Sequence, residues 1–153
     1  MGWEVLLFLA GLFMVIGGIE ASGLLDWLMT PVKGVIWRGE LFAALTMLWM
    51  GAILSSLGGA VPATMALIPV AQALIELGRF GPSIWWGLAS GVGLGANGTL
   101  VGGAANALSA SLLSRSHGSI TFKDWLKKCA PVAIASWVLA SFFLWVSIVQ
   151  LLC

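Results

Sequence analysis

Two short polar stretches interrupt a chain that is otherwise strongly apolar. The first surrounds Asn97 and continues to Asn106, and the second begins at Ser55 and Ser56. Their amide and hydroxyl groups donate and accept hydrogen bonds but carry no charge, so they suit the binding of a small ion or polar solute. The candidate binding residues are Asn97, Gly98, Thr99, Asn106, Ser55, Ser56, Gly58 and Gly59.

These stretches offer no chemistry for an enzyme. Residues 41–75 and 80–114 contain no Asp, Glu, Lys or Arg, whereas an active site needs an acid, a base, a nucleophile or metal ligands. Cys129 and Cys153 have neither metal-ligand nor disulfide-framework spacing, and His117 lies beside Arg115 in a polar loop. We therefore expect no catalytic residue, no bound metal and no organic cofactor.

The composition places the chain in a lipid bilayer. Hydrophobic residues make up 60% of its 153 residues and charged residues only 8%, whereas a soluble domain carries about 25% charged residues. A net charge of +1 provides no basic surface for nucleic acid. Most of the nine Trp residues lie near the ends of apolar windows, as in aromatic belts, and we expect the deeper Trp49, Trp137 and Trp145 to be packing residues.

The apolar windows predict an all-α membrane protein with a single transmembrane domain. A bilayer core of about 30 Å needs a helix of about 20 residues, so each 35-residue window must turn back or break. The first segment has no signal-peptide features, and we expect it to be retained. The predicted elements are a helix over 3–20, an interfacial arm over 22–39, a helical hairpin over 41–78 with its tip at 55–62, a broken helix over 84–113 with its break at 95–99, and a helix over 122–152.

The hairpin and the break have different sequence signals. Gly58 and Gly59 suit a tight reversal, and Pro62 suits the first turn of a new helix. The hairpin is compatible with two full crossings and with a re-entrant pair. In the other window, the half-helices are expected at about 84–94 and 99–113, with Thr99 and Asn106 on one face of the second.

The charged loops predict an orientation. Residues 114–128 carry four Lys or Arg against Asp124, so the positive-inside rule places this loop in the cytoplasm. Counting crossings from there puts Met1 inside and Asp26, Arg79 and Cys153 outside. The cell (inner) membrane is the expected location.

The polar residues at depth have two interpretations. Gly, Ser and Asn can simply support close helix packing. Alternatively, discontinuous helices are the means by which secondary transporters bind substrate at the midplane. Helix starts near Pro62 and Thr99 would then favour an anion, and carbonyl groups near Leu54 and Leu94 would favour a small cation. Matches to a dinucleotide fingerprint (93–98) and a glycosylation acceptor (97–99) lack the context that either needs.

Several motifs resemble the ion transporter superfamily, which includes arsenite permeases, sodium/proton antiporters and citrate or dicarboxylate transporters. The resemblance covers nearly the whole chain and is greatest to the arsenite and sodium/proton branch. The motifs that carry it are 7–13, Gly17-Gly18-Ile19-Glu20, 23–28, Ile68-Pro69, 95–102, Ala105-Asn106 and 120–122.

The resemblance implies a secondary transporter built from two inverted repeats, of which this chain is similar to the second. It implies a substrate such as arsenite or another oxyanion, a carboxylate, or Na⁺ or H⁺, with Na⁺ or H⁺ as the candidate coupling ion. Many relatives carry an Asp-Asn pair before a Val-Pro at the hairpin tip, but here Gly59-Ala60 precede Val61-Pro62. The expected partners are lipid, a small ion or anion, and either a second half-transporter chain or an antiparallel copy. A non-transporting membrane scaffold or truncated remnant is the alternative.

Overall fold

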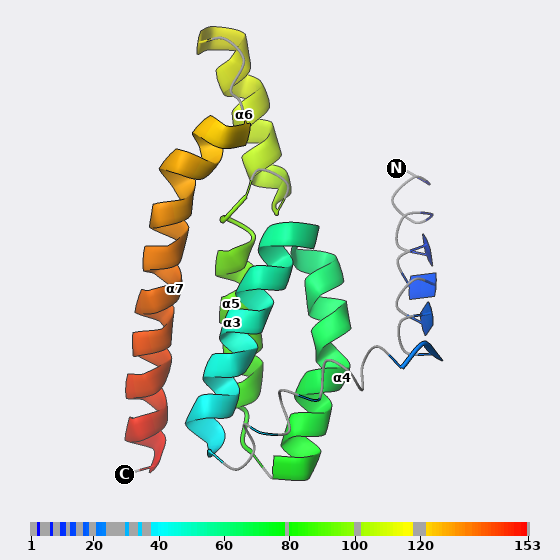
Figure 1. Cartoon of the computed structure of the whole chain (residues 1–153), viewed down its shortest axis with the longest axis vertical. Helices are drawn as coiled ribbons and strands as arrows, with labels where there is room; N and C mark the ends of the chain where they lie inside the picture. The colour runs from blue at the N-terminus through cyan, green and yellow to red at the C-terminus, as the bar shows by residue number, and fades with distance from the viewer. Residues whose placement is uncertain are drawn as a thin grey trace.

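All of the regular secondary structure in the described part of the chain is helical. This computed structural model describes residues 38–78, 80–99, 102–117 and 122–152, with scattered positions before residue 38. Its helices are α3 (Glu40–Gly58), α4 (Ala60–Gly78), α5 (Ser83–Gly95), α6 (Ala104–His117) and α7 (Phe122–Leu152). In Figure 1, α3, α4 and α5 lie together, α7 runs along one side, and α6 extends beyond the end where α3 meets α4. No strand occurs in these ranges, which confirms the all-α prediction.

The two N-terminal elements fall largely outside the described residues. The few described positions between Trp3 and Gly18 have helical backbone, but most of the predicted helix over 3–20 and of the arm over 22–39 is not described. Both elements therefore stay predictions.

A single residue, Gly59, separates α3 from α4. Its φ of +92° lies in the left-handed region that favours glycine. The Gly59 N–H donates to the Ser55 carbonyl at 2.9 Å, and the Gly59 carbonyl accepts from the Ala63 N–H at 3.3 Å, so hydrogen bonding continues on both sides. The turn is thus narrower than the predicted tip over 55–62. Pro62 lies in the first turn of α4, where a missing N–H costs no helical bond.

Helix α5 lies against α3 at backbone contact, because three glycines one turn apart face it. A Cβ added to Gly87, Gly91 or Gly95 would come within 2.1 to 2.4 Å of the α3 backbone, closer than real Cβ atoms approach. The α3 atoms that it would meet belong to Ala44, Leu48 and Ala52, which are likewise one turn apart. We call this contact the α3–α5 seam. Small residues allow such close approach between membrane helices.

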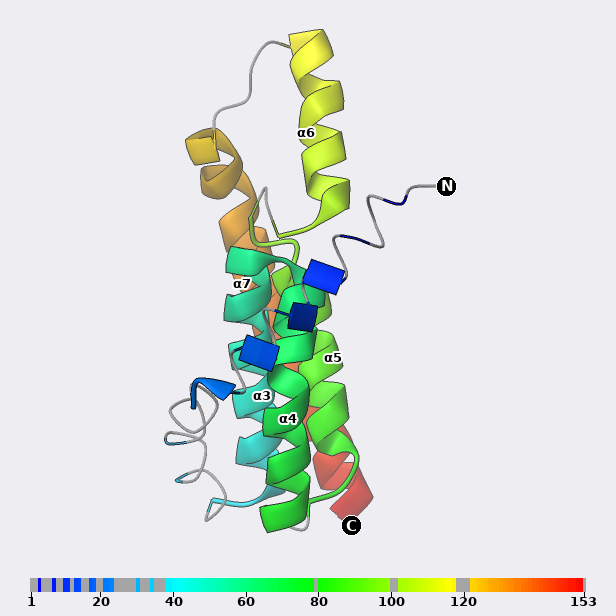
Figure 2. The same cartoon turned by 90° about the vertical axis from the view of Figure 1, so that its right-hand side faces the viewer.

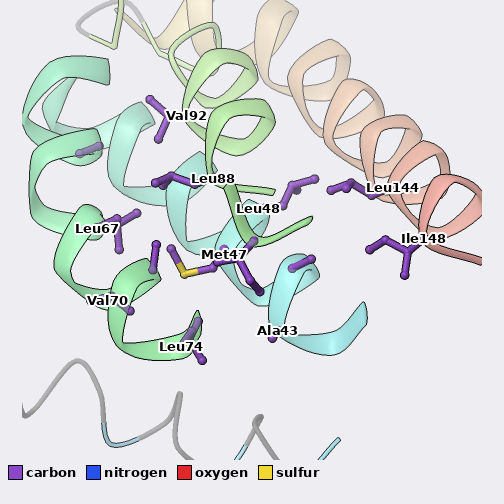
Figure 3. Packing of buried hydrophobic residues seen from close by; sticks show 14 residues of the cluster. Ala43, Met47, Leu48, Leu67, Val70, Leu74, Leu88, Val92, Leu144 and Ile148 are labelled. Atoms are coloured by element: carbon purple, nitrogen blue, oxygen red, sulfur yellow. The ribbon is translucent and has the colours of Figure 1, made fainter. Parts of the chain in front are cut away.

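The apolar core lies around the seam and draws on four helices. Figure 3 shows Met47 of α3 pointing toward the side chains of α4, while Leu144 and Ile148 of α7 approach from the opposite side. The fully buried large side chains include Met47, Leu48, Leu67, Val70, Leu74 and Ile84. This packing holds the hairpin, α5 and α7 in one unit.

The starts of α3 and α5 are tied together at one end of this unit. The Glu40 side chain accepts a hydrogen bond from the Gly81 N–H at 3.0 Å and another from the Ser83 hydroxyl. Helix α3 has 19 residues and α5 has 13, so they rise about 28 Å and about 20 Å from that common level. Helix α5 therefore ends beside α3, before α3 reaches its own end.

Within the described ranges, three helices are long and apolar enough to cross a membrane. They are α3, α4 and residues Trp125–Gln150 of α7. Helix α5 covers only about two thirds of a 30 Å hydrocarbon core, and the chain then loses helical form before α6 begins (Figure 2). The end of α6 and the start of α7 lie at the opposite end of the molecule from the C-terminus (Figure 1).

Candidate functional site

The hairpin tip meets the break in the second window. The Thr99 hydroxyl donates a hydrogen bond to the backbone carbonyl of Ser56, at the end of α3. A Cβ added to Gly98 would lie 3.3 Å from the Ser56 Cβ, and one added to Gly59 would lie 3.8 Å from the Gly102 carbonyl oxygen. The structure thus brings together candidate residues that are about 40 positions apart in the chain.

The break lies between the end of α5 at Gly95 and the start of α6 at Ala104, and two side chains hold its described residues, 96–99 and 102–103. The Asn106 Nδ2 group donates to the Ala96 and Thr99 carbonyls, at 2.9 Å each. The Gly102 N–H donates to the Thr99 hydroxyl oxygen at 3.0 Å. These bonds satisfy backbone groups that a helix would otherwise pair, as irregular backbone inside a membrane requires.

Helix α6 begins at Ala104, five residues later than the predicted half-helix over 99–113. Thr99 and Gly102 therefore lie in the break and not on a helix face with Asn106. The physical reason is that the Thr99 hydroxyl and the Asn106 amide compete successfully with helical hydrogen bonding here.

The two serines of the hairpin tip are buried and use their hydroxyls within the protein. The Ser55 hydroxyl donates across the seam to the Val92 carbonyl at 2.8 Å, in the last turn of α5. The Ser56 hydroxyl donates to the Ile53 carbonyl of its own helix at 2.8 Å. Ser55 therefore fixes the hairpin tip to the end of α5.

Two predicted site residues remain at the edge of this cluster. Asn97 is exposed, and its side chain has no hydrogen-bond partner among the residues that the structure describes. Gly58 is also exposed, and a Cβ added there would meet nothing within 4 Å. Of the polar side chains at the break, the Asn97 amide is therefore available to a ligand.

A tryptophan of α7, Trp137, also contacts the break, although its position in the sequence predicts only a packing role. The Trp137 ring lies 3.3 Å, at its Cζ2 atom, from the position of a Cβ on Gly98. It packs edge-on against Trp49 of α3, with centroids 6.0 Å apart and an interplanar angle of 85°. Its Nε1 atom is buried without a hydrogen-bond partner in the described structure. The sequence signal was its position deep in an apolar span, away from the aromatic belts.

A groove runs between α5 and α7, and the candidate residues do not line it. Its volume is about 740 Å³. Most of its lining is apolar, including Trp86, Leu94, Phe143 and Leu144, and its polar groups include Glu40 and Ser83. An apolar surface of this kind suits a lipid chain or another helix better than an ion.

Several backbone acceptors at the end of α5 are already engaged. The carbonyls of Val92, Leu94, Gly95 and Ala96, at the end of α5, each already accept at least one hydrogen bond. Helices α4 and α6 both begin near this point, with the positive ends of their dipoles. No group of three His, Cys, Asp or Glu gathers anywhere in the described ranges.

Comparisons with known proteins place the chain among transporters. A sequence profile described as citrate transporter matches residues 1–91. An uncharacterized transporter of Mycobacterium tuberculosis is 29% identical over 146 residues, which are 94% of this chain and 34% of the relative. An uncharacterized transporter of Synechocystis is 28% identical over 97% of this chain and 37% of its own length.

The human P protein is 30% identical over 142 residues, covering 88% of this chain and 17% of the relative. The chain thus spans about a third of the length of the bacterial relatives described above. No solved structure matches. The profile covers more than half of the chain, and the chain therefore belongs to the citrate transporter family of integral membrane proteins.

Proposed function

We propose that this chain forms half of a secondary active transporter, and that its substrate binds where the hairpin tip meets the break. The observation that carries the proposal is the Thr99–Ser56 hydrogen bond, which joins two helix interruptions within charge-free stretches of the chain. Paired interruptions of this kind create substrate sites in membrane transporters. Asn97, Thr99 and Asn106 line the site, and the hairpin tip closes it.

A small anion is the substrate that these groups favour. The α5 carbonyls that would coordinate a cation already accept hydrogen bonds, whereas the Asn97 amide is available. The starts of α4 and α6 add positive dipole ends near the break. The hairpin tip also lacks a carboxylate that could hold Na⁺ or H⁺. An oxyanion or a carboxylate therefore suits the site better than a bare cation.

The second half of the pathway comes from a partner. The described helices include one hairpin and one break, whereas inverted-repeat transporters place the substrate site between two repeats. The partner is either a separate repeat-sized chain or an antiparallel copy. The net positive charge of residues 114–128 supports a fixed orientation, and hence a distinct partner.

The orientation follows the positive-inside count. The connection between α6 and α7 faces the cytoplasm, and the C-terminus faces outward. The arrangement in Figure 1 supports this proposal, because the two lie at opposite ends of the molecule.

Transport by reconstituted protein tests the proposal. Proteoliposomes holding the chain, alone and with any repeat-sized partner encoded nearby, are assayed for uptake or exchange of citrate, arsenite and Na⁺. We expect flux of an anion, reduced to background by Asn97→Ala. Absence of flux for all three probes would refute the proposal.

A non-transporting membrane scaffold is the second candidate. The observation that favours it is that Ser55, Thr99 and Asn106 all bind backbone groups of the chain itself. Cross-linking in native membranes separates the two candidates, since a scaffold of this size requires no stoichiometric repeat-sized partner. Recovery of monomer alone would favour the scaffold.

A further inference from the structure

We infer that the indole N–H of Trp137 is a substrate-binding donor, which contacts an oxygen atom of an anion held at the break. This inference rests on the proposed function and deepens it. It adds a residue from α7 to a site that the sequence places entirely on the hairpin and the broken helix.

The Trp137 indole ring lies against the break. The Trp137 Cζ2 atom lies against Gly98, in the middle of the break, and a Cβ at Gly98 would approach it to 3.3 Å. In an indole, Cζ2 is one bond from the carbon that bears Nε1, so the N–H group lies at the same edge of the ring. Trp49 holds the ring edge-on from α3. The donor therefore faces the neighbourhood of the break with little freedom to turn away.

The indole N–H of Trp137 lacks a hydrogen-bond partner in the described structure. Trp137 Nε1 is buried and has no partner among the described residues. A buried indole N–H normally has a partner, because leaving a donor unsatisfied is costly. At the break, the Ser56 carbonyl is already engaged by Thr99, and the Ala96 and Thr99 carbonyls by Asn106. An acceptor brought by the substrate satisfies the donor without dismantling those bonds.

The chain contains a matched control. Trp125 is also buried without a partner at Nε1, but it lies twelve residues earlier on α7, about 18 Å along the helix. If an unpartnered indole were only a packing feature, changes at the two positions would have similar effects. If Trp137 binds substrate, only its change will alter substrate affinity.

The experiment replaces one indole N–H by sulfur, through site-specific incorporation of benzothienylalanine at position 137 or 125. Uptake of citrate and of arsenite is measured in proteoliposomes that contain the full protein and its partner. For the anion that the wild type carries, we expect KM to rise about tenfold or more at position 137, as for one lost hydrogen bond to a charged group, with protein yield unchanged. Position 125 should leave KM unchanged.

A second measurement uses the wild-type protein, so it does not depend on the folding of a variant. Ser136-Trp137 is the only Ser-Trp pair in the chain, so selective labelling with ¹³C-Ser and ¹⁵N-Trp identifies the Trp137 residue and, through it, its indole signal. Titration with the transported anion should shift the Trp137 indole signal and leave that of Trp125 in place. An unchanged KM at position 137, or an indole signal that does not move, overturns the inference while wild-type flux upholds the proposed function. Absence of wild-type flux refutes both.

Discussion

The α3–α5 seam and the break after α5 are adjacent, yet they are built in opposite ways. The seam depends on missing side chains: because Gly87, Gly91 and Gly95 have no Cβ, the backbone of α5 contacts the backbone of α3. The break exists because particular atoms are present, namely the Thr99 hydroxyl and the Asn106 amide. The seam should therefore fail when a side chain is enlarged, and the break should fail when one is shortened.

The largest effect is expected from adding atoms to the seam. Gly91→Ala places a Cβ 2.1 Å from the Leu48 carbonyl oxygen and 2.8 Å from its Cα, so the two helices must separate. We expect a loss of at least about 3 kcal/mol, the upper end for overpacking. Folded protein, measured by size-exclusion chromatography after extraction, should fall strongly.

Gly93→Ala is the control for that substitution. It makes the same change two residues away on α5, where nothing lies within 4 Å. Its yield should match or exceed that of the wild type, because alanine favours helix more than glycine does. Equal losses in the two variants would show that the seam is not the determinant.

The next largest effect is expected from removing the amide that holds the break. Asn106→Ala leaves the Ala96 and Thr99 carbonyls without their side-chain donor, at a cost of about 1–3 kcal/mol for each unsatisfied group. The loss should be local, so amide hydrogen exchange should accelerate over 96–103 and stay slow along α3. Ser109→Ala, at an exposed position one turn later in α6, should change neither.

A smaller effect is expected at the contact between the hairpin tip and the break. Thr99→Val keeps the shape of the side chain but removes the hydroxyl that donates to Ser56 and accepts from Gly102. We expect about 1–3 kcal/mol of destabilisation, seen as faster hydrogen exchange of the Gly59 amide, which is bonded to the Ser55 carbonyl at the hairpin tip. Thr99→Ser restores the hydroxyl and should restore slow exchange; fast exchange in the serine variant would contradict this role.

The smallest effect on the fold, with the sharpest effect on transport, is expected at Asn97. Its exposed side chain makes no hydrogen bond within the described part of the protein, so Asn97→Ala should alter stability by less than about 0.5 kcal/mol. Anion flux should nevertheless fall to background. Wild-type flux in this variant would return Asn97 to the protein surface as a residue without a transport role.

The sequence predicted the helical class, and the paired interruptions could be anticipated because their glycines and polar residues lie inside windows too long for one helix. The start of α6 could not be predicted. The helical periodicity over 99–113 does not reveal that Thr99 and Asn106 use their side chains to bind backbone carbonyls, which ends the helical hydrogen bonding there. The four-residue spacing of Gly87, Gly91 and Gly95 indicates a close contact, but it does not identify α3 as the partner. Trp137 approaches the break only through tertiary packing, which no local pattern encodes.

The seam also determines which parts of the molecule can move independently. Its contacts repeat every four residues, so a smaller slide of α5 along α3 would drive side chains such as Leu88 or Val92 into the opposing backbone. The smallest step that restores the fit is about 6 Å. Helices α3 and α5 must therefore move as one rigid unit. If the break is exposed in turn to each side of the membrane, as the proposed function requires, then α6, α7 or the proposed partner must move.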